Sequence, residues 1–137
     1  MHRLNVRVYY EDVDLAGVVY YANYLRFYER GRTEALRAFG VDQMKMRDAE
    51  KLVFVVTRLN CDFLGPARFN DLLEIQTEIT AVRSASLDIA QAVLCQDAVL
   101  NRAKVTCACM DVSQSAGGRP ARLPEELRTR LARSAAA

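Results

Sequence analysis

Apolar and polar residues alternate at every second position through most of this chain, a pattern typical of strands that bury one face. Residues 3–10 are the first such segment, with an apolar side formed by Leu4, Val6, Val8 and Tyr10. The later segments are 53–64, 72–82, 86–96 and 99–112. Short breaks at Gly65-Pro66, Arg83-Ser84 and Gln96-Asp97 suit hairpins and meander connections.

Each later segment is expected to turn its apolar side toward a common core. In 53–64 this side consists of Val55, Thr57, Leu59, Cys61 and Phe63. In 72–82 it consists of Leu73, Ile75, Thr77, Ile79 and Ala81, while Glu74, Gln76 and Glu78 face away. In 86–96 and 99–112 it consists of Leu87, Ile89, Val93 and Cys95, and of Ala103, Val105, Cys107 and Cys109.

Between the first two strands, the spacing predicts a helix from about 22 to 39. Its apolar stripe, at steps of three and four, is Tyr24, Phe27, Tyr28, Gly31, Ala35 and Phe39. Gly31 costs about 1 kcal/mol of helix propensity against alanine, so we expect the helix to approach a sheet closely there. Gly40 is placed to end the helix in a left-handed cap. Residues 41–50 are expected to form either a short second helix or an irregular connection.

This order of strand, long helix and four strands predicts an α+β fold. An antiparallel sheet of about five strands is expected to wrap around the one long central helix. The 137 residues, 1–137, suit a single domain. Its tail from about 124 is expected to be a short helix, with Pro124 in the first turn and the last few residues disordered.

Composition narrows the class of protein. The chain is 51% hydrophobic and 26% charged, as in ordinary soluble proteins, and its net charge of +2 does not indicate nucleic acid. No run approaches the ~18 apolar residues of a membrane span, and the N-terminus lacks the apolar stretch of a signal peptide. We therefore expect a cytoplasmic protein.

The four cysteines fall in the strand segments. Cys107 and Cys109 point to the same face of a strand and do not easily bridge each other. The one histidine, His2, stands at the end of the chain, so no converging metal ligands are evident. Reduced thiols, no metal site and no cofactor are expected.

Residues 9–24, YYEDVDLAGVVYYANY, carry the candidate chemistry. Asp14 precedes Gly17 by three positions, and a helix follows. A carboxylate aimed at helix N-terminal N–H groups can attack a carbonyl or activate water, because those N–H groups stabilise the oxyanion. The alternatives are that Asp14 only shapes the turn, as Asp12 is expected to do, or that Glu29 on the helix acts instead.

The segment YYEDVDLAGVVYYANYLRFYERGRTEAL resembles acyl-CoA thioesterases of the hotdog fold, as does LNCDFLGPARFNDLLEIQTEI. The nearest branches are the 4-hydroxybenzoyl-CoA thioesterase type and the thioesterase associated with the Tol-Pal envelope system. The resemblance implies that Asp14 is the catalytic carboxylate and that the backbone N–H of Tyr21 polarises the thioester carbonyl. It also implies a homodimer or homotetramer with the active site at the subunit interface.

The substrate-binding residues expected from the motif are Gly17 and Val18. Tyr20 or Tyr24 would either line the acyl pocket or serve core or interface packing, as most tyrosines of this segment are expected to do. Arg83 and Ser84 stand at a strand connection where this family commonly meets coenzyme A, and the alternative is an ordinary polar turn. Arg58, Arg68 and Arg102 are either phosphate contacts or plain surface charge. Many Tol-Pal members carry histidine where this chain has Tyr21, so histidine-assisted hydrolysis is excluded and the acyl group stays open.

We therefore expect hydrolysis of acyl-CoA thioesters to a free carboxylic acid and coenzyme A. The alternative is a non-catalytic module that binds acyl-CoA or an acyl-carrier protein, linked to envelope lipid metabolism. Serine-hydrolase, P-loop and dinucleotide-binding motifs are absent from the sequence. The expected partners are the acyl-CoA substrate, a second copy of the chain, and an acyl-carrier protein or envelope lipid enzymes.

Overall fold

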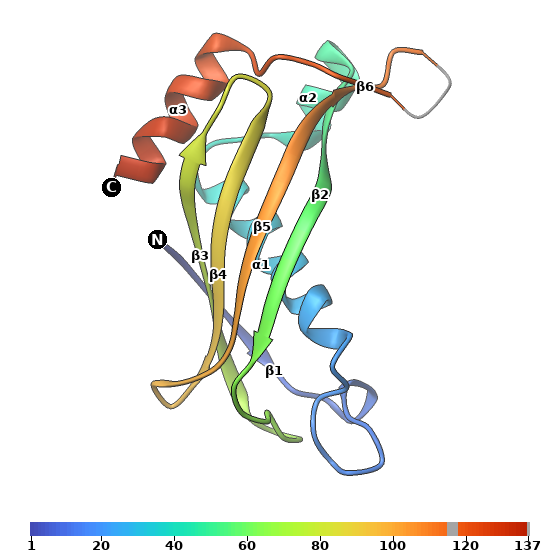
Figure 1. Cartoon of the computed structure of the whole chain (residues 1–137), viewed down its shortest axis with the longest axis vertical. Coiled ribbons are helices and arrows are strands. Elements are labelled where there is room, and N and C mark those ends of the chain that lie inside the picture. Colours follow the sequence, from blue (N-terminus) through green and yellow to red (C-terminus); the bar gives the residue numbers. More distant parts are fainter. Residues whose placement is uncertain (115–117, 137) are drawn as a thin grey trace.

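A curled antiparallel sheet in the order β1-β3-β4-β5-β2, with β6 beside β5, forms the frame of the protein (Figure 1). The computed structural model describes residues 1–114 and 118–136. The strands are β1 His2–Arg7, β2 Leu52–Phe63, β3 Leu72–Val82, β4 Ser86–Cys95, β5 Ala98–Asp111 and β6 Arg119–Pro120. The helices are α1 Asn23–Ala38, α2 Gln43–Glu50 and α3 Glu125–Ala136, with a short 3-10 turn, η1, at Tyr10–Asp12.

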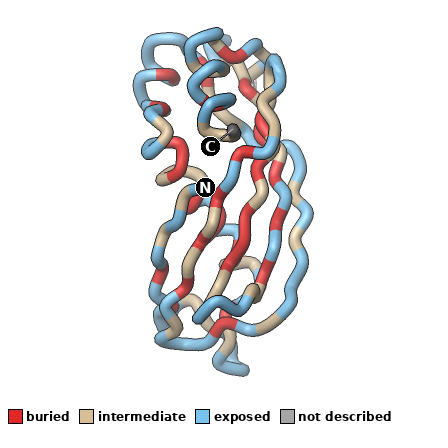
Figure 2. Tube along the Cα trace, turned by 90° about the vertical axis from the view of Figure 1, so that its left-hand side faces the viewer, coloured by how far each residue is buried: buried red, intermediate tan, exposed pale blue. Residues whose placement is uncertain are grey.

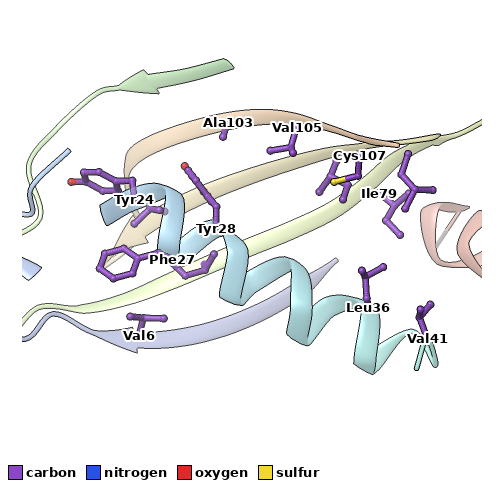
Figure 3. Close-up of a cluster of buried hydrophobic side chains, with 14 of the residues drawn as sticks. Val6, Tyr24, Phe27, Tyr28, Leu36, Val41, Ile79, Ala103, Val105 and Cys107 are labelled. Atoms are coloured by element: carbon purple, nitrogen blue, oxygen red, sulfur yellow. The ribbon is translucent and has the colours of Figure 1, made fainter. Parts of the chain in front are cut away.

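Helix α1 lies in the curve of the sheet and supplies much of the core (Figures 1 and 3). The predicted stripe is confirmed, because Tyr24, Phe27, Tyr28 and Ala35 are buried and Phe39 packs against the core. Buried residues line the strands that face the helix, and exposed residues alternate with them (Figure 2). The expected α+β hotdog arrangement is confirmed.

Gly31 marks the closest approach of α1 to the sheet. A Cβ built there would lie 2.8 Å from Ile75 Cγ2 and 2.9 Å from Thr77 Oγ1. These distances are shorter than real Cβ contacts, so the glycine is required by packing as predicted. Gly40 ends the helix at φ 87°, and the Val41 N–H donates to the Leu36 carbonyl in a Schellman cap.

The first strand is shorter than expected. It ends at Arg7, and the chain then turns into η1. Val8 is still fully buried, but Tyr10 is 82% exposed. The expectation that Tyr10 extends the apolar side of the strand is therefore wrong, because alternation cannot continue through a 3-10 turn.

The predicted apolar side of β2 is wrong in its first half. A β-bulge between Val56 and Arg58 inserts an extra residue. Before the bulge, the even-numbered Leu52 and Phe54 pack on the core, and only after it do odd-numbered residues such as Leu59 do so. Val55 and Thr57 are accordingly exposed, since one added residue exchanges the two faces of a strand.

The tail folds more completely than expected. Helix α3 continues to Ala136, and its Leu131 is fully buried, so the last few described residues are helical rather than disordered. Ala137 lies outside the described residues. Across residues 1–114 and 118–136, no helix combines the length and apolar character that crossing a membrane requires.

Candidate active site

The loop between η1 and α1 lies at the end of the sheet where β2 finishes, directly before the start of α1 (Figure 1). Two isolated antiparallel bridges order this loop: Val13 pairs with Val19, and Val18 pairs with Arg68. The Val19 N–H also donates to the Ala67 carbonyl at 2.8 Å. The loop is thus held against residues 67–68 after β2.

Asp14 sits at the turn of this loop with an exposed side chain. Its Oδ1 accepts hydrogen bonds from the N–H groups of Ala16 at 2.8 Å and Val18 at 3.4 Å. Gly17, at φ 78°, donates its N–H to the Asp14 carbonyl. The second carboxylate oxygen, Oδ2, accepts no hydrogen bond from any described residue. Asp14 therefore both shapes the turn and keeps one oxygen open.

Asp12 serves the structure of the loop, as expected. Its Oδ2 accepts the Tyr9 N–H at 2.8 Å. Its main-chain carbonyl accepts two hydrogen bonds, from the Tyr20 N–H and from Asn23 Nδ2, both at 2.9 Å. Glu29 is exposed and accepts a hydrogen bond from the Thr33 hydroxyl, which fits the expected solvated face of α1.

The start of α1 has no side-chain cap. Ala22 occupies the N-cap position, and no side chain bonds there. The N–H groups of Asn23 and Tyr24 donate to the carbonyls of Tyr20 and Tyr21. Within the part of the chain that the structure describes, the N–H groups of Tyr21 and Ala22 donate to no protein oxygen. These groups and the helix dipole can stabilise a developing negative charge.

Aromatic rings surround this helix start. The rings of Tyr20 and Tyr21 lie 4.9 Å apart, and Phe63, at the end of β2, lies edge-to-face 6.3 Å from Tyr21 and 5.7 Å from Tyr24. Tyr20 and Tyr21 are exposed, whereas Tyr24 is buried and accepts the Ala67 N–H on its hydroxyl. Burial raises the pKa of Tyr24. Tyr24 is thus part of the floor beneath the exposed rings.

Phe63 was not predicted as a site residue. Alternation placed it correctly on the inner side of its strand, but its contact with Tyr21 arises only from the fold. Asn23 was also missed, although it follows Tyr21 closely in the same motif.

Arg83 and Ser84 lie at the β3–β4 turn, at the opposite end of the sheet from Asp14 (Figure 1). The Arg83 guanidinium donates to both oxygens of Asp88, at 2.6 and 2.5 Å, and this hydrogen bonding holds the pKa of the Asp88 carboxyl below its usual range. The Ser84 carbonyl accepts the Leu123 N–H. Within one chain, the fold does not bring these two residues to the site.

The arginines differ in their placement. The backbone of Arg68 pairs with Val18, so Arg68 belongs to the active-site end. Arg58 and Arg102 are exposed residues of β2 and β5, away from the core. The sequence alone did not separate them.

The four cysteines are free thiols, of which Cys107 and Cys109 are buried. Burial raises the pKa of the Cys107 and Cys109 thiols. Cys61 donates to Asn101 Oδ1 at 3.0 Å. Among residues 1–114 and 118–136, no cluster of three or more histidine, cysteine or acidic side chains could hold a metal ion.

A curled antiparallel sheet wrapped around one long helix places this protein in the class of hotdog-fold proteins. Residues 8–131 match the thioesterase-like superfamily, and the chain belongs to it. The acyl-CoA thioester hydrolase YbgC of Escherichia coli O6:H1 is 46% identical over 112 residues, which cover 81% of this chain and 83% of that protein.

Solved structures agree with this assignment. A probable thioesterase from Bartonella henselae has 37% identity and a TM-score of 0.82, and the match covers 90% of this chain and 98% of that one. A 4-hydroxybenzoyl-CoA thioesterase complexed with 4-hydroxybenzoyl-CoA has a TM-score of 0.89 at 19% identity, covering 95% of this chain and 97% of that one. The second likeness is one of fold alone.

Proposed function

We propose that this acyl-CoA thioesterase forms free carboxylic acid and coenzyme A with Asp14 as nucleophile or general base and the Tyr21 N–H as the carbonyl-polarising donor. One observation carries the assignment. The open Oδ2 of Asp14 belongs to a loop that is hydrogen-bonded to the uncapped start of α1. A carboxylate and an oxyanion donor are thereby held on neighbouring segments.

The chemistry follows one of two balanced routes. In the first, Asp14 attacks the thioester carbonyl, the C–S bond breaks with departure of the thiolate, and water hydrolyses the resulting mixed anhydride. In the second, Asp14 takes a proton from water as that water attacks the same carbon. In both routes the Tyr21 N–H donates to the carbonyl oxygen as it becomes negative. A thiolate leaves readily, so no general acid is needed.

The alternative considered from the sequence was a module that binds acyl-CoA or an acyl-carrier protein without turnover, and the 46% identity to an acyl-CoA thioester hydrolase favours the enzyme. The two are distinguished by release of free thiol from short-chain, long-chain and aromatic acyl-CoAs. Thioester hydrolysis predicts release from at least one substrate, whereas binding without release across the whole panel would favour the module. An acylated acyl-carrier protein presents the same thioester, so it is added to the panel as a substrate. We propose acyl-carrier protein and envelope lipid enzymes as further binding partners.

We propose that the acyl group lies over Tyr20 and the Gly17–Val18 segment, with Phe63 and Tyr24 as its inner boundary. Phe63 is 54% exposed and rests on the rings of Tyr21 and Tyr24, so it stands where an acyl chain bound at Tyr21 would continue. The shape of this boundary would decide whether the site accepts an aromatic or an aliphatic acyl group, which is the difference between the two family branches.

Phe63→Ala is expected to raise the relative kcat/KM for longer over shorter acyl-CoAs by about tenfold, because a removed ring leaves space for further methylenes. The measurement is thiol release across the chain-length panel. Phe69→Ala is the matched control, since Phe69 is 49% exposed and contacts Tyr10 rather than the helix start. Equal substrate profiles for the two variants would remove Phe63 from the acyl site.

We propose that the homodimer forms through β2. This strand is a sheet edge bonded only to β5 within residues 1–114 and 118–136, and Val55 and Val56 on it are 44% and 43% exposed. An open apolar edge favours pairing with another strand. Antiparallel pairing of two β2 strands would set the β3–β4 turn of a second copy beside the Asp14 end of the first. Arg83 and Ser84 of that copy would then reach the coenzyme A.

Lysine at Val55 and Val56 together is expected to reduce the mass measured by light scattering to that of one chain, because charges on a strand edge oppose pairing. If the active site needs residues of the second copy, the monomeric variant is also expected to release less thiol than the wild type. Leu72→Lys is the control, as Leu72 is a similarly exposed apolar residue of β3. Unchanged mass at micromolar concentration in the β2 variant would contradict the proposed interface.

We propose a homotetramer as the further assembly, formed through the outer face of the sheet. Across it, Glu78 of β3, Ala90 of β4 and Lys104 of β5 stand side by side in register. A two-fold axis parallel to β4 would bring the acidic strand of one copy opposite the basic strand of another. We also propose a cytoplasmic location for the assembled protein.

A further inference from the structure

Asn23 links the start of α1 to the loop that carries Asp14. Its side-chain Nδ2 donates to the carbonyl oxygen of Asp12 at 2.9 Å in a partly buried position. Asp12 precedes Asp14 by two residues, and Asn23 follows Tyr21 by two residues. One side-chain hydrogen bond therefore connects the two segments that hold the proposed carboxylate and the proposed oxyanion donor.

The remaining connections near this point are made by the main chain. The Tyr20 N–H donates to the same Asp12 carbonyl at 2.9 Å, and the Asp14 N–H donates to the Val18 carbonyl at 2.9 Å. These bonds fix the path of the loop. The Asn23 amide adds a second anchor to Asp12, from the first residue of the helix itself.

We propose that Asn23 is a positioning residue, which sets the separation between the Asp14 carboxylate and the Tyr21 N–H through the main chain of Asp12. The inference rests on the function proposed above. It follows from the demands of the reaction, since displacement of a reacting group by about 1 Å can cost about 10²-fold in rate. Substrate binding along the rest of the site does not depend on this separation.

A purely structural role predicts a different result. A hydrogen bond of this kind contributes about 1 kcal/mol to stability. Its loss leaves the Asp12 carbonyl bonded to the Tyr20 N–H, so no buried acceptor becomes unpaired. The fold is therefore expected to tolerate replacement of Asn23, and the effect on the reaction can be measured.

The experiment compares Asn23→Ala and Asn23→Asp with the wild type by thiol release and by thermal unfolding. Asn23→Ala is expected to lower kcat about tenfold or more, with KM within about threefold. Asn23→Asp keeps the shape, but its carboxylate oxygen would face the Asp12 carbonyl oxygen and be repelled by it. A helix N-terminus favours the added charge and offsets this repulsion, so the stability is expected to match that of Asn23→Ala. Its kcat is expected to fall further, because this charge opposes the oxyanion. A structural role predicts that activity follows stability in both variants.

Thr80→Val is the matched control, because the Thr80 hydroxyl also donates to a main-chain carbonyl, that of Asp88, outside the site. It is expected to leave kcat unchanged. The Asn23→Ala substitution is then repeated in an Asp14→Asn background, where its effect on the residual rate should disappear if Asn23 acts through Asp14. An undiminished effect there, or wild-type kcat in Asn23→Ala, overturns the positioning role. Wild-type activity of Asp14→Asn alone instead overturns the proposed catalytic role of Asp14.

Discussion

Asp14→Asn is expected to lower kcat/KM for thioester hydrolysis by about 10²-fold or more, the usual cost of removing a principal catalytic group. Asparagine has nearly the same shape and keeps an oxygen that can accept the Ala16 N–H, as Asp14 Oδ1 does now. The turn before Gly17 should therefore survive. The loss of rate then measures the removal of a nucleophile or base rather than collapse of the loop.

The measurement is free-thiol release with the best substrate of the acyl-CoA panel. Thermal unfolding of Asp14→Asn and the wild type checks that the two proteins are equally stable. Glu11→Gln provides the control, since Glu11 is an exposed carboxylate three positions away in the same segment. Its kcat/KM is expected to stay within about twofold. Near wild-type activity of Asp14→Asn would remove Asp14 from the mechanism, and an equal loss in Glu11→Gln would point to a general charge effect.

Much of the fold could be predicted because most strands of this sheet bury one face. The periods of β3 and β5 give their bounds almost to the residue, since a slip of one position would expose a whole apolar row. The inner side of β2 could not be predicted in the same way. Its bulge at Val56–Arg58 exchanges the two faces partway along, and no residue in that segment signals it.

The candidate site was predictable where its parts are neighbours in sequence. Asp14, Gly17 and Tyr21 belong to one loop and the helix that follows, so the motif alone gathers them. Phe63 joins them only through the pairing of distant strands.

Arg83 was expected near the coenzyme A, and the length of β3 explains why one chain cannot place it there. The strand has 11 residues. At about 3.3 Å per residue it carries the chain roughly 35 Å from the Asp14 end of the sheet. A sequence pattern predicts the β3–β4 turn. It does not predict that this turn lies far from Asp14 of its own chain, or that it would approach the active site of a second copy.

Gly31→Val is expected to lower the free energy of unfolding by about 3 kcal/mol, at the upper end of the usual cost of overpacking. The added atoms would meet Ile75 and Thr77, both buried in the sheet, where even a Cβ already lies under 3.0 Å from each. Gly31→Ala is the milder case. It gains about 1 kcal/mol of helix propensity, yet should still lose about 1 kcal/mol overall, because the same contacts are too short.

Urea denaturation measures both changes, with an unchanged slope as evidence that unfolding stays two-state. Gly65→Ala is the control, since its Cβ would meet only the end of the Leu100 side chain, at 3.3 Å. Its effect is expected to stay within about 0.5 kcal/mol. A Gly31→Ala protein more stable than the wild type would show that helix propensity outweighs packing here. The close approach of α1 to the sheet would then not be what requires glycine at this position.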